Sequence, residues 1–398
     1  MMRGKTITIV LAFSIFITVI TGEISAVKRL PDKDSLSATI GKLKVSFSPL
    51  KYTWYNRVDG AFLGFRSQVF IPHHLEYSLT LSAGYSFMTQ KPRYGVVFTR
   101  NGSEKIPFTV AVDYQDETAT NDSYTVSRFE NTLAGLLTGR DFWDYFSLRS
   151  GGVTVSFDKY ERLKLRTRAE IRSYHALYQN TSWSLSGKNR FRPNPGVIPG
   201  TEGYLSGGII WDSRKNTFYP GNAWYVTLMG EKGFHDFSYS GMMFQAKRYQ
   251  MIFGMQRFVT RVLVRTRQGT HAEQHLFDLG GPGTLRGFTV KEFTGNRFFM
   301  TNIDYFFGGT VLKKLPFDRI PLYNGLNMVL FTDIGSAAIV DDSTFLLKNI
   351  LVNSHPALFS DIGFGLSFAQ DILRFDCARR LDRRISAWVF SMRINQRL

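Results

Sequence analysis

The sequence is poor in two features that would otherwise define its class, cysteine and long apolar runs. Its single cysteine, Cys377, has no partner in the chain, so no internal disulfide stabilises the fold. Beyond residue 26, no continuous apolar run approaches the ~20 residues that a transmembrane helix needs. A helical inner-membrane protein is therefore excluded, and a membrane-bound form of the chain has to cross the bilayer with strands.

Acidic residues are also scarce relative to basic ones. The chain has 32 Asp and Glu against 49 Lys and Arg, and its formal charge is +17. Such a balance often indicates nucleic-acid binding, but the N-terminus indicates export instead. Arg3 and Lys5 precede an apolar run from Ile7 to Ile20 and small residues through Ala26, which predicts a cleaved signal peptide. The basic excess then suits a polar lumen, anionic lipid headgroups or an anionic permeant, and nucleic acid is not expected as a partner.

A two-residue period is the strongest pattern that the sequence does have. Between residues 162 and 174, basic side chains occupy most even positions and apolar or small side chains most odd ones. A strand places such alternating positions on opposite faces, and in a membrane barrel the charged face meets the lumen. A second segment, 257–267, shows the same alternation. We predict that the basic lumen face includes Arg162, Lys164, Arg166, Arg168, Arg172, Arg261 and Arg265.

Similar segments recur along the whole chain and predict an all-β fold, a transmembrane antiparallel β-barrel of about 16 strands. Residues 1–26 are assigned to the signal peptide, 27–42 to a short N-terminal segment and 43–398 to the barrel domain. Long connections are expected near 116–149, 177–202, 269–296 and 336–360. The predicted strands are 43–53, 61–70, 75–88, 93–100, 107–115, 150–158, 162–175, 203–212, 223–232, 238–252, 255–268, 297–308, 325–334, 361–369, 372–379 and 384–394.

One glycine-rich connection carries an arginine that needs an acidic partner. It reads Gly280-Gly281-Pro282-Gly283-Thr284-Leu285-Arg286-Gly287-Phe288, and we single out Gly280, Gly281, Leu285, Arg286, Gly287 and Phe288. Asp304 and Asp333 follow in two predicted strands. If both carboxylates face the lumen, a loop folded back inside brings Arg286 to them, where its planar fork can bond two acceptors. Taken alone, the four residues from Leu285 to Phe288 fit an exposed glycine-rich turn better, and the two downstream aspartate motifs reverse that preference.

This loop, with Asn302-Ile303-Asp304 and Phe331-Thr332-Asp333-Ile334-Gly335, resembles the motifs of the BamA/TamA-like superfamily. Its members are outer-membrane proteins that insert or translocate other proteins. Tyr55–Gly64, Gly203–Arg214 with Tyr219-Pro220-Gly221, and Gly363–Asp376 are similar to further segments of that superfamily, so the resemblance covers residues 43–398. It implies a bacterial outer-membrane location, a lumenal loop held by its arginine, and a labile seam between the first and last strands at which a client strand adds.

Members of the superfamily that assemble or secrete proteins carry periplasmic POTRA modules before the barrel. Only Val27 to Gly41 is available for them here, so a separate POTRA-containing periplasmic partner or the barrel itself is expected to capture client proteins. Outer-membrane lipid is a second expected partner, with lipopolysaccharide as a candidate.

Two functions remain open: a protein insertion or translocation factor, and a passive, anion-preferring pore or structural surface antigen. A soluble exported β-protein is a more distant third. We expect no enzyme activity, because no serine lies in a nucleophile elbow and the two histidines of His271-Ala272-Glu273-Gln274-His275 fall in a loop or strand rather than on one face of a helix. No metal, cofactor or catalytic residue is predicted.

Overall fold

The computed structural model of the chain describes residues 36–40, 43–48, 52–71, 74–103, 105–187, 191–215, 220–253, 256–307, 326–348, 358–368 and 372–394. The predicted signal peptide, residues 1–26, lies outside the described residues. The same holds for most of the short segment 27–42 and for Tyr219 of the motif that ends in Gly221.

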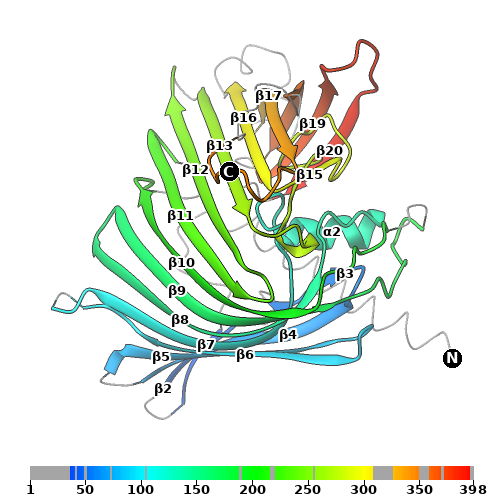
Figure 1. The fold of residues 1–398 in the computed structure, drawn as a ribbon. Coiled ribbons are helices and arrows are strands. Elements are labelled where there is room, and N and C mark those ends of the chain that lie inside the picture. The colour runs from blue at the N-terminus through cyan, green and yellow to red at the C-terminus, as the bar shows by residue number, and fades with distance from the viewer. Residues whose placement is uncertain are drawn as a thin grey trace.

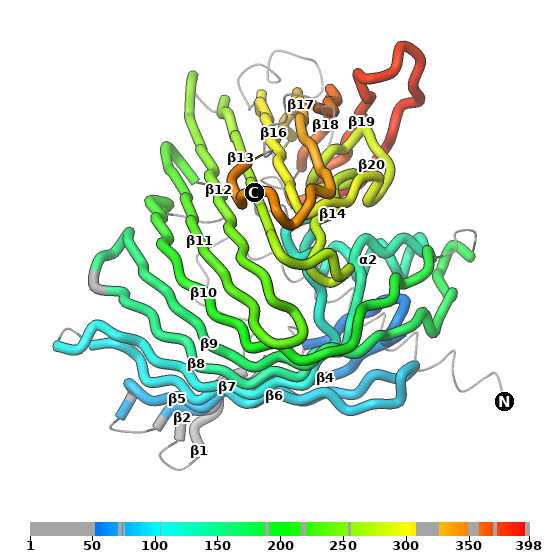
Figure 2. Tube along the Cα trace, viewed as in Figure 1, coloured from blue at the N-terminus to red at the C-terminus, as the bar shows by residue number. Residues whose placement is uncertain are grey.

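A single, strongly curved antiparallel sheet forms the molecule, and its strands follow one another in chain order (Figure 1). Figure 2 traces this path from β3 and β4 on one side, through the long strands in the middle, to β19 and β20 on the other. The first strands are β1 (Leu36–Ile40), β2 (Leu43–Ser48), β3 (Trp54–Asn56), β4 (Gly60–Ile71), β5 (His74–Ser86), β6 (Lys91–Arg100), β7 (Phe108–Ala119), β8 (Phe146–Tyr160) and β9 (Leu163–Ala176). They continue with β10 (Gly200–Asp212), β11 (Ala223–His235), β12 (Tyr239–Met251), β13 (Arg257–Gln268), β16 (Arg297–Phe307), β17 (Asn327–Ala338), β18 (Phe359–Phe368), β19 (Leu373–Arg380) and β20 (Val389–Ile394).

The wall has sixteen strand positions. β2 and β3 both pair with β4 and make one interrupted first strand, which precedes the ten strands β4 to β13 and the five strands β16 to β20. β1 adds a further pairing to β2. Within the described residues, no backbone pairing joins β20 to β1, β2 or β3; we call these two facing edges the seam.

All sixteen predicted strands are present, so the predicted fold class is confirmed. Most boundaries agree within three residues, but β8 begins at Phe146, four residues earlier than predicted. The first predicted strand, 43–53, is interrupted between β2 and β3. Arg162 lies in the turn before β9 rather than in the strand itself.

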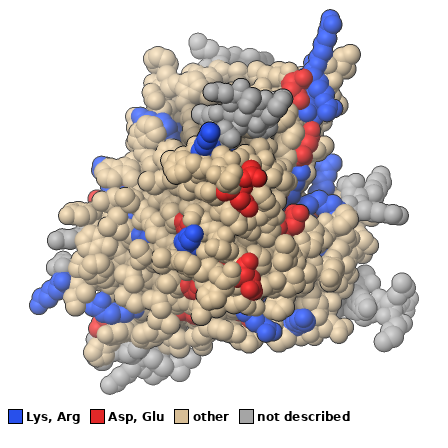
Figure 3. All heavy atoms as spheres, viewed as in Figure 1, with Lys and Arg blue, Asp and Glu red and all other residues tan. Residues whose placement is uncertain are grey.

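The outward face of the strands is apolar. On β18, Ile362, Phe364 and Leu366 are about half exposed, while the alternating residues point inward and are buried. Figure 3 shows one face of the molecule on which charged side chains are few and uncharged side chains cover most of the surface. An apolar band of this extent suits contact with lipid rather than water. Among the described residues, the helices are all too short or too polar to cross a bilayer.

The connections at one end of the sheet are long, and they pack inside it. Because neighbouring strands are antiparallel, the segments 120–145, 177–199 and 269–296 all leave from the same end. They contain helix α2 (Arg128–Thr138), the short helix η2 (Glu273–His275) and the hairpin of β14 (Phe277–Leu279) and β15 (Phe293–Gly295). In Figure 1, α2 lies in the opening between β20 and β3. The interior at this end is therefore filled by loops.

Candidate functional site: an arginine-anchored loop inside the barrel

The segment between β14 and β15 turns sharply because three glycines supply backbone angles that other residues rarely adopt. Gly280, Gly281 and Gly283 have φ of 121°, 90° and 88°. A Cβ at Gly283 would lie 1.8 Å from the carbonyl oxygen of Thr125, so the turn also fits closely against a second loop. Leu285 and Phe288 then enter an apolar cluster with Phe298 and Met300 of β16. This packing fixes the two residues between them, Arg286 and Gly287.

The guanidinium of Arg286 is buried against two carboxylates of the barrel wall. Its Nε and Nη2 donate to the two oxygens of Asp333 at 2.7 and 2.6 Å, and its Nη1 donates to Asp304 Oδ1 at 2.8 Å. The backbone N–H of Arg286 also donates to Asp333, at 3.1 Å. The centre of the guanidinium lies 3.6 Å from the centre of the Phe331 ring, so a cation–π contact covers its face. The structure thus brings together the three residues that the sequence singled out.

Two further carboxylates and a second arginine complete this network, which we call the arginine anchor. The Nε of Arg374 donates to Asp376 at 2.6 Å, and its Nη2 donates to the same Asp304 oxygen that binds Arg286, at 2.8 Å. The backbone N–H of Gly287 donates to Asp361 at 2.8 Å. The strands β16 to β19 therefore converge on one loop through their inward faces.

Position 287 has no space for a side chain, so it requires glycine. A Cβ there would lie 2.8 Å from the Cβ of Asp361 and 2.9 Å from the backbone nitrogen of Arg380. Real Cβ contacts are not that short, so a side chain at Gly287 would push the loop away from β18 and β19.

Lys291 holds the far side of the same loop. Its Nζ lies 2.6 Å from Asp122, 2.5 Å from Asp144 and 2.7 Å from Asp278. Burial by itself would lower the pKa of Lys291, but the three carboxylates outweigh burial and hold that pKa above its usual value. These carboxylates are close enough together to share a metal ion, and the Lys291 ammonium contacts all three. They act here as the acceptors of an ammonium that ties the loop to the segment 120–145.

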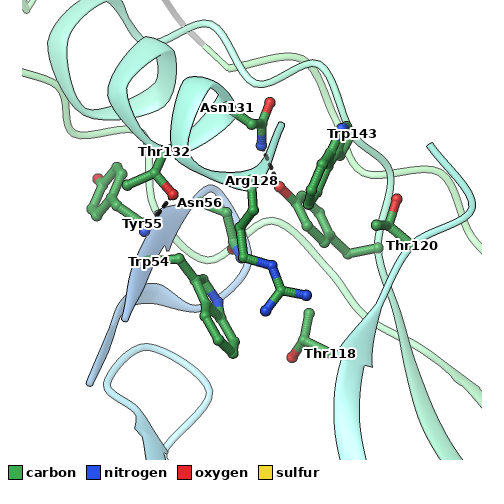
Figure 4. A pocket seen from close by; sticks show the side chains of 10 residues that line it. Trp54, Tyr55, Asn56, Thr118, Thr120, Arg128, Asn131, Thr132 and Trp143 are labelled. Atoms are coloured by element: carbon green, nitrogen blue, oxygen red, sulfur yellow. Dashed lines mark hydrogen bonds between the residues drawn. The ribbon is translucent and has the colours of Figure 1, made fainter. Parts of the chain in front are cut away.

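The segment 120–145 is in turn tied to the first strand. Arg57, fully buried in the turn between β3 and β4, donates to Asp144 at 2.5 Å and to Asn194 at 3.1 Å. Figure 4 shows the neighbouring contacts around a small pocket: the Thr132 hydroxyl accepts from the backbone N–H of Tyr55 at 3.3 Å, and Asn131 donates to the hydroxyl of Tyr145 at 2.7 Å. Helix α2 is thereby fastened to β3.

Helix α2 also contacts the last strand. The Nε of Arg393, on β20, donates to Glu130 Oε1 at 2.5 Å, and both side chains are buried. Because α2 packs on β3 and is ion-paired to β20, it bridges the two sides of the seam.

The predicted basic lumen face divides into two groups. Arg168 and Arg172 are ion-paired on the inward face of β9, Arg168 to Asp113 at 2.7 Å and Arg172 to Glu202 at 3.2 Å, and both contact Glu170. Lys164 and Arg166, two to four positions further from the loops, are exposed, and no ion pair to another described residue is recorded for either. Arg162 is exposed in its turn.

On β13 the predicted arginines hold loops instead of facing open lumen. Arg261 donates to the backbone carbonyls of Tyr124 and Gly283, at 3.0 and 3.3 Å. The guanidinium of Arg265 lies 4.5 Å from the centre of the Tyr124 ring. These side chains therefore link the wall to the same two loops that the arginine anchor and Lys291 fix.

Sequence reasoning missed several members of these networks. The two-residue period puts Arg374 and Asp376 on the face of β19 opposite Phe375, and this is the signal that could have added them to the site. Helix α2 also had local signals: Ser127 caps it by accepting from the Glu130 backbone N–H, and Gly139 ends it with φ of 68°. Nothing in the sequence pattern indicated Lys291, because its three partners come from separate loops.

No protein-family model and no curated protein matches the chain in sequence. Solved structures do match in three dimensions. The crystal structure of BamA from Haemophilus ducreyi lacking POTRA domains 1–3 aligns with a TM-score of 0.56 and 11% identity, over 90% of this chain and 74% of that one. The fold is that of a BamA-like barrel.

Two CdiB structures are also similar to this BamA-like barrel. CdiB from Escherichia coli aligns with a TM-score of 0.48 at 11% identity, and CdiB from Acinetobacter baumannii with 0.43 at 12%. The alignment with the Escherichia coli protein covers 92% of this chain and 63% of that one. The alignment with the Acinetobacter baumannii protein covers 89% of this chain and 60% of that one. The BamA-like fold and the apolar outward face together place the barrel in an outer membrane.

Proposed function

We propose that this BamA-like barrel assists the insertion or translocation of proteins at the outer membrane, together with a separate periplasmic partner. The observation that carries the proposal is the arginine anchor, which holds the loop 269–296 inside the barrel through four carboxylates on β16 to β19. A loop held inside the lumen narrows the path that a passive pore needs. A barrel whose wall opens between its first and last strands needs its other strands to stay in place, and the arginine anchor would hold β16 to β19 there.

The seam supplies the place where the wall would part. Within the described residues the backbone of β20 pairs only with β19, and β3 pairs only with β4. Backbone groups left unpaired in lipid cost several kcal/mol each, so strands that part at the seam would favour pairing with another strand. A client strand that adds to this edge satisfies those groups by β-augmentation. We expect no covalent chemistry in this process.

A matched pair of photocrosslinking positions tests this proposal. Phe390 on β20 and Leu228 on β11 both face outward, with 71% and 44% of their surface exposed. A photoreactive amino acid at Phe390 should capture newly synthesised outer-membrane proteins in living cells, whereas the same group at Leu228 should not. Equal capture at both positions, or capture at neither, would contradict the proposal.

The passive pore is kept as a second candidate because Lys164 and Arg166 are exposed on the inward face of β9. Planar-bilayer recording separates the two functions. A large, steady, anion-selective conductance that falls in Lys164→Glu and Arg166→Glu would favour the pore. Small or rare openings in both the original chain and these variants favour the insertion factor.

A further inference from the structure

The outward face of the described wall has a shallow, open depression of about 690 Å³. It crosses β7 to β11 along a row of paired positions that the strand register defines as Tyr114, Gly151, Ile171, Gly203 and Phe234. The large side chains of this row are exposed, Ile171 by 65%. The two glycines leave gaps on either side of Ile171. The depression is therefore an apolar groove on the lipid-facing surface, and we call it the outer groove.

The glycines of the outer groove are not required by the backbone. An added Cβ at Gly151 would meet nothing nearer than 3.7 Å, and one at Gly203 nothing nearer than 3.4 Å. Neither residue has positive φ. Both positions could therefore carry a side chain, and its absence leaves space that a ligand can fill.

A polar row adjoins the groove on the side nearer the long loops. In register, it reads Asp116, Arg149, Ser173 and Thr201. The change from apolar to polar side chains marks the boundary between hydrocarbon and headgroups. The outer groove thus lies just inside that boundary, where the first carbons of an acyl chain are found.

Arg149 gives this boundary a positive charge. Its side chain is 60% exposed, and its Nε donates to Asp116 at 2.8 Å, an acceptor that also binds Arg93. Two arginines therefore share one carboxylate, which leaves a net positive charge. The two terminal nitrogens of Arg149 make no recorded hydrogen bond to the described residues, so they are available to a phosphate oxygen.

We propose that this surface binds one phosphorylated lipid of the loop-side leaflet, with an acyl chain in the outer groove and its phosphate at Arg149. Charge complementarity selects the headgroup, and the two glycine gaps select a chain that lies against the wall. The site does not depend on client insertion, because it faces the lipid on β7 to β11, away from the seam.

Native mass spectrometry of the purified full chain in detergent tests this site, with lipid A as the phosphorylated probe and phosphatidylcholine as the zwitterionic comparison. The chain should retain one lipid A and not retain phosphatidylcholine. Arg149→Gln should weaken retention about tenfold, because a charge-assisted hydrogen bond is lost. Gly151→Leu and Gly203→Leu should weaken it by a similar factor, because their side chains fill the groove. Gly151→Ala, which adds one methyl group, should have a smaller effect.

Two control variants change the outward face elsewhere. Arg248→Gln removes a cation that lies 5.1 Å from the centre of the Trp224 ring, toward the other end of the barrel. Gly230→Leu fills an exposed position where a Cβ would meet only the Gly207 carbonyl, at 3.9 Å. Both should retain lipid A as the original chain does. Equal retention of the two lipids, or unchanged retention in either Arg149→Gln or the two leucine variants, would overturn the proposal. Heat-resistant migration in gels shows that each variant is folded.

Discussion

Two parts of the barrel wall present arginines to the interior, and they use them differently. Against β16 to β19, Arg286 of the loop and Arg374 of β19 are buried, and three aspartates, Asp304, Asp333 and Asp376, are ion-paired to them. On β9, Arg168 and Arg172 are partly exposed in a chain of pairs, and Lys164 and Arg166 face water. Arginines that face the interior thus form a buried structural anchor in one place and a solvated surface in the other.

The difference is one of desolvation. A buried ion pair that loses one member leaves an uncompensated charge and costs about 3–5 kcal/mol, whereas an exposed pair contributes about 0–1 kcal/mol. Substitutions of charged residues should therefore destabilise the barrel strongly where the loop 269–296 meets β16 to β19, and only weakly on β9.

The largest effect is expected for Arg286→Ala. It leaves Asp333 and Asp304 buried with one fewer cation, so the unfolding free energy should fall by about 3–5 kcal/mol. Urea titration of the barrel in detergent micelles measures this. Arg286→Lys retains the charge but not the planar fork, and it should lose less. A stability of Arg286→Ala within ~0.5 kcal/mol of the original would show that the network is not an anchor.

A smaller loss is expected for Gly287→Ala. The added methyl group would meet Asp361 and the backbone of Arg380, and overpacking of this kind costs about 1–3 kcal/mol. Gly221→Ala is the matched control, because a Cβ there would meet nothing within 4 Å. If the two alanine variants unfolded at the same urea concentration, the close fit of the loop against β18 and β19 would be disproved.

The bridge across the seam should give a third, weaker effect. Glu130→Gln removes the charge that Arg393 binds while retaining a hydrogen-bond acceptor, so a loss of about 1–2 kcal/mol is expected. The change should also raise hydrogen exchange in β20 without raising it in β11. Uniform exchange in both strands would indicate that α2 does not hold the last strand.

Arg166→Gln should have the least effect. Its side chain is exposed on the inward face of β9, so the unfolding free energy should change by less than ~0.5 kcal/mol. A loss of unfolding free energy as large as that of Arg286→Ala would contradict the difference between β9 and the strands β16 to β19.

The strands could be predicted from the sequence because each one shows a two-residue alternation of apolar and polar side chains. The strands β4 to β13 and β16 to β20 were all predicted, including β13 and β16, whose inward faces carry Arg261 and Asp304. Alternation defines the ends of a strand less well than its middle, and β8 begins at Phe146, four residues before its predicted start. It also says nothing about loops, so α2 and Lys291 were found only in three dimensions.

The predicted site was incomplete for a related reason. The spacing of motifs selected Arg286, Asp304 and Asp333, and the register places Asp333 beside Asp361 on the neighbouring strand. Whether an inward carboxylate reaches the loop depends on the curvature of the barrel and on how far the loop enters it. The two-residue alternation of the strands gives neither quantity. Alternation can therefore place Arg374 and Asp376 on the inward face, but only the structure shows that they and Asp361 reach the loop network.

The most direct test of the central claim is the accessibility of the loop that Arg286 anchors. Thr284 is fully buried in that loop, and the native Cys377 can be removed by Cys377→Ala. In proteoliposomes, the thiol introduced by Thr284→Cys should react slowly with a water-soluble maleimide, and Arg286→Ala should raise its rate at least tenfold. Rapid labelling with Arg286 intact, or an unchanged rate in Arg286→Ala, would contradict the account.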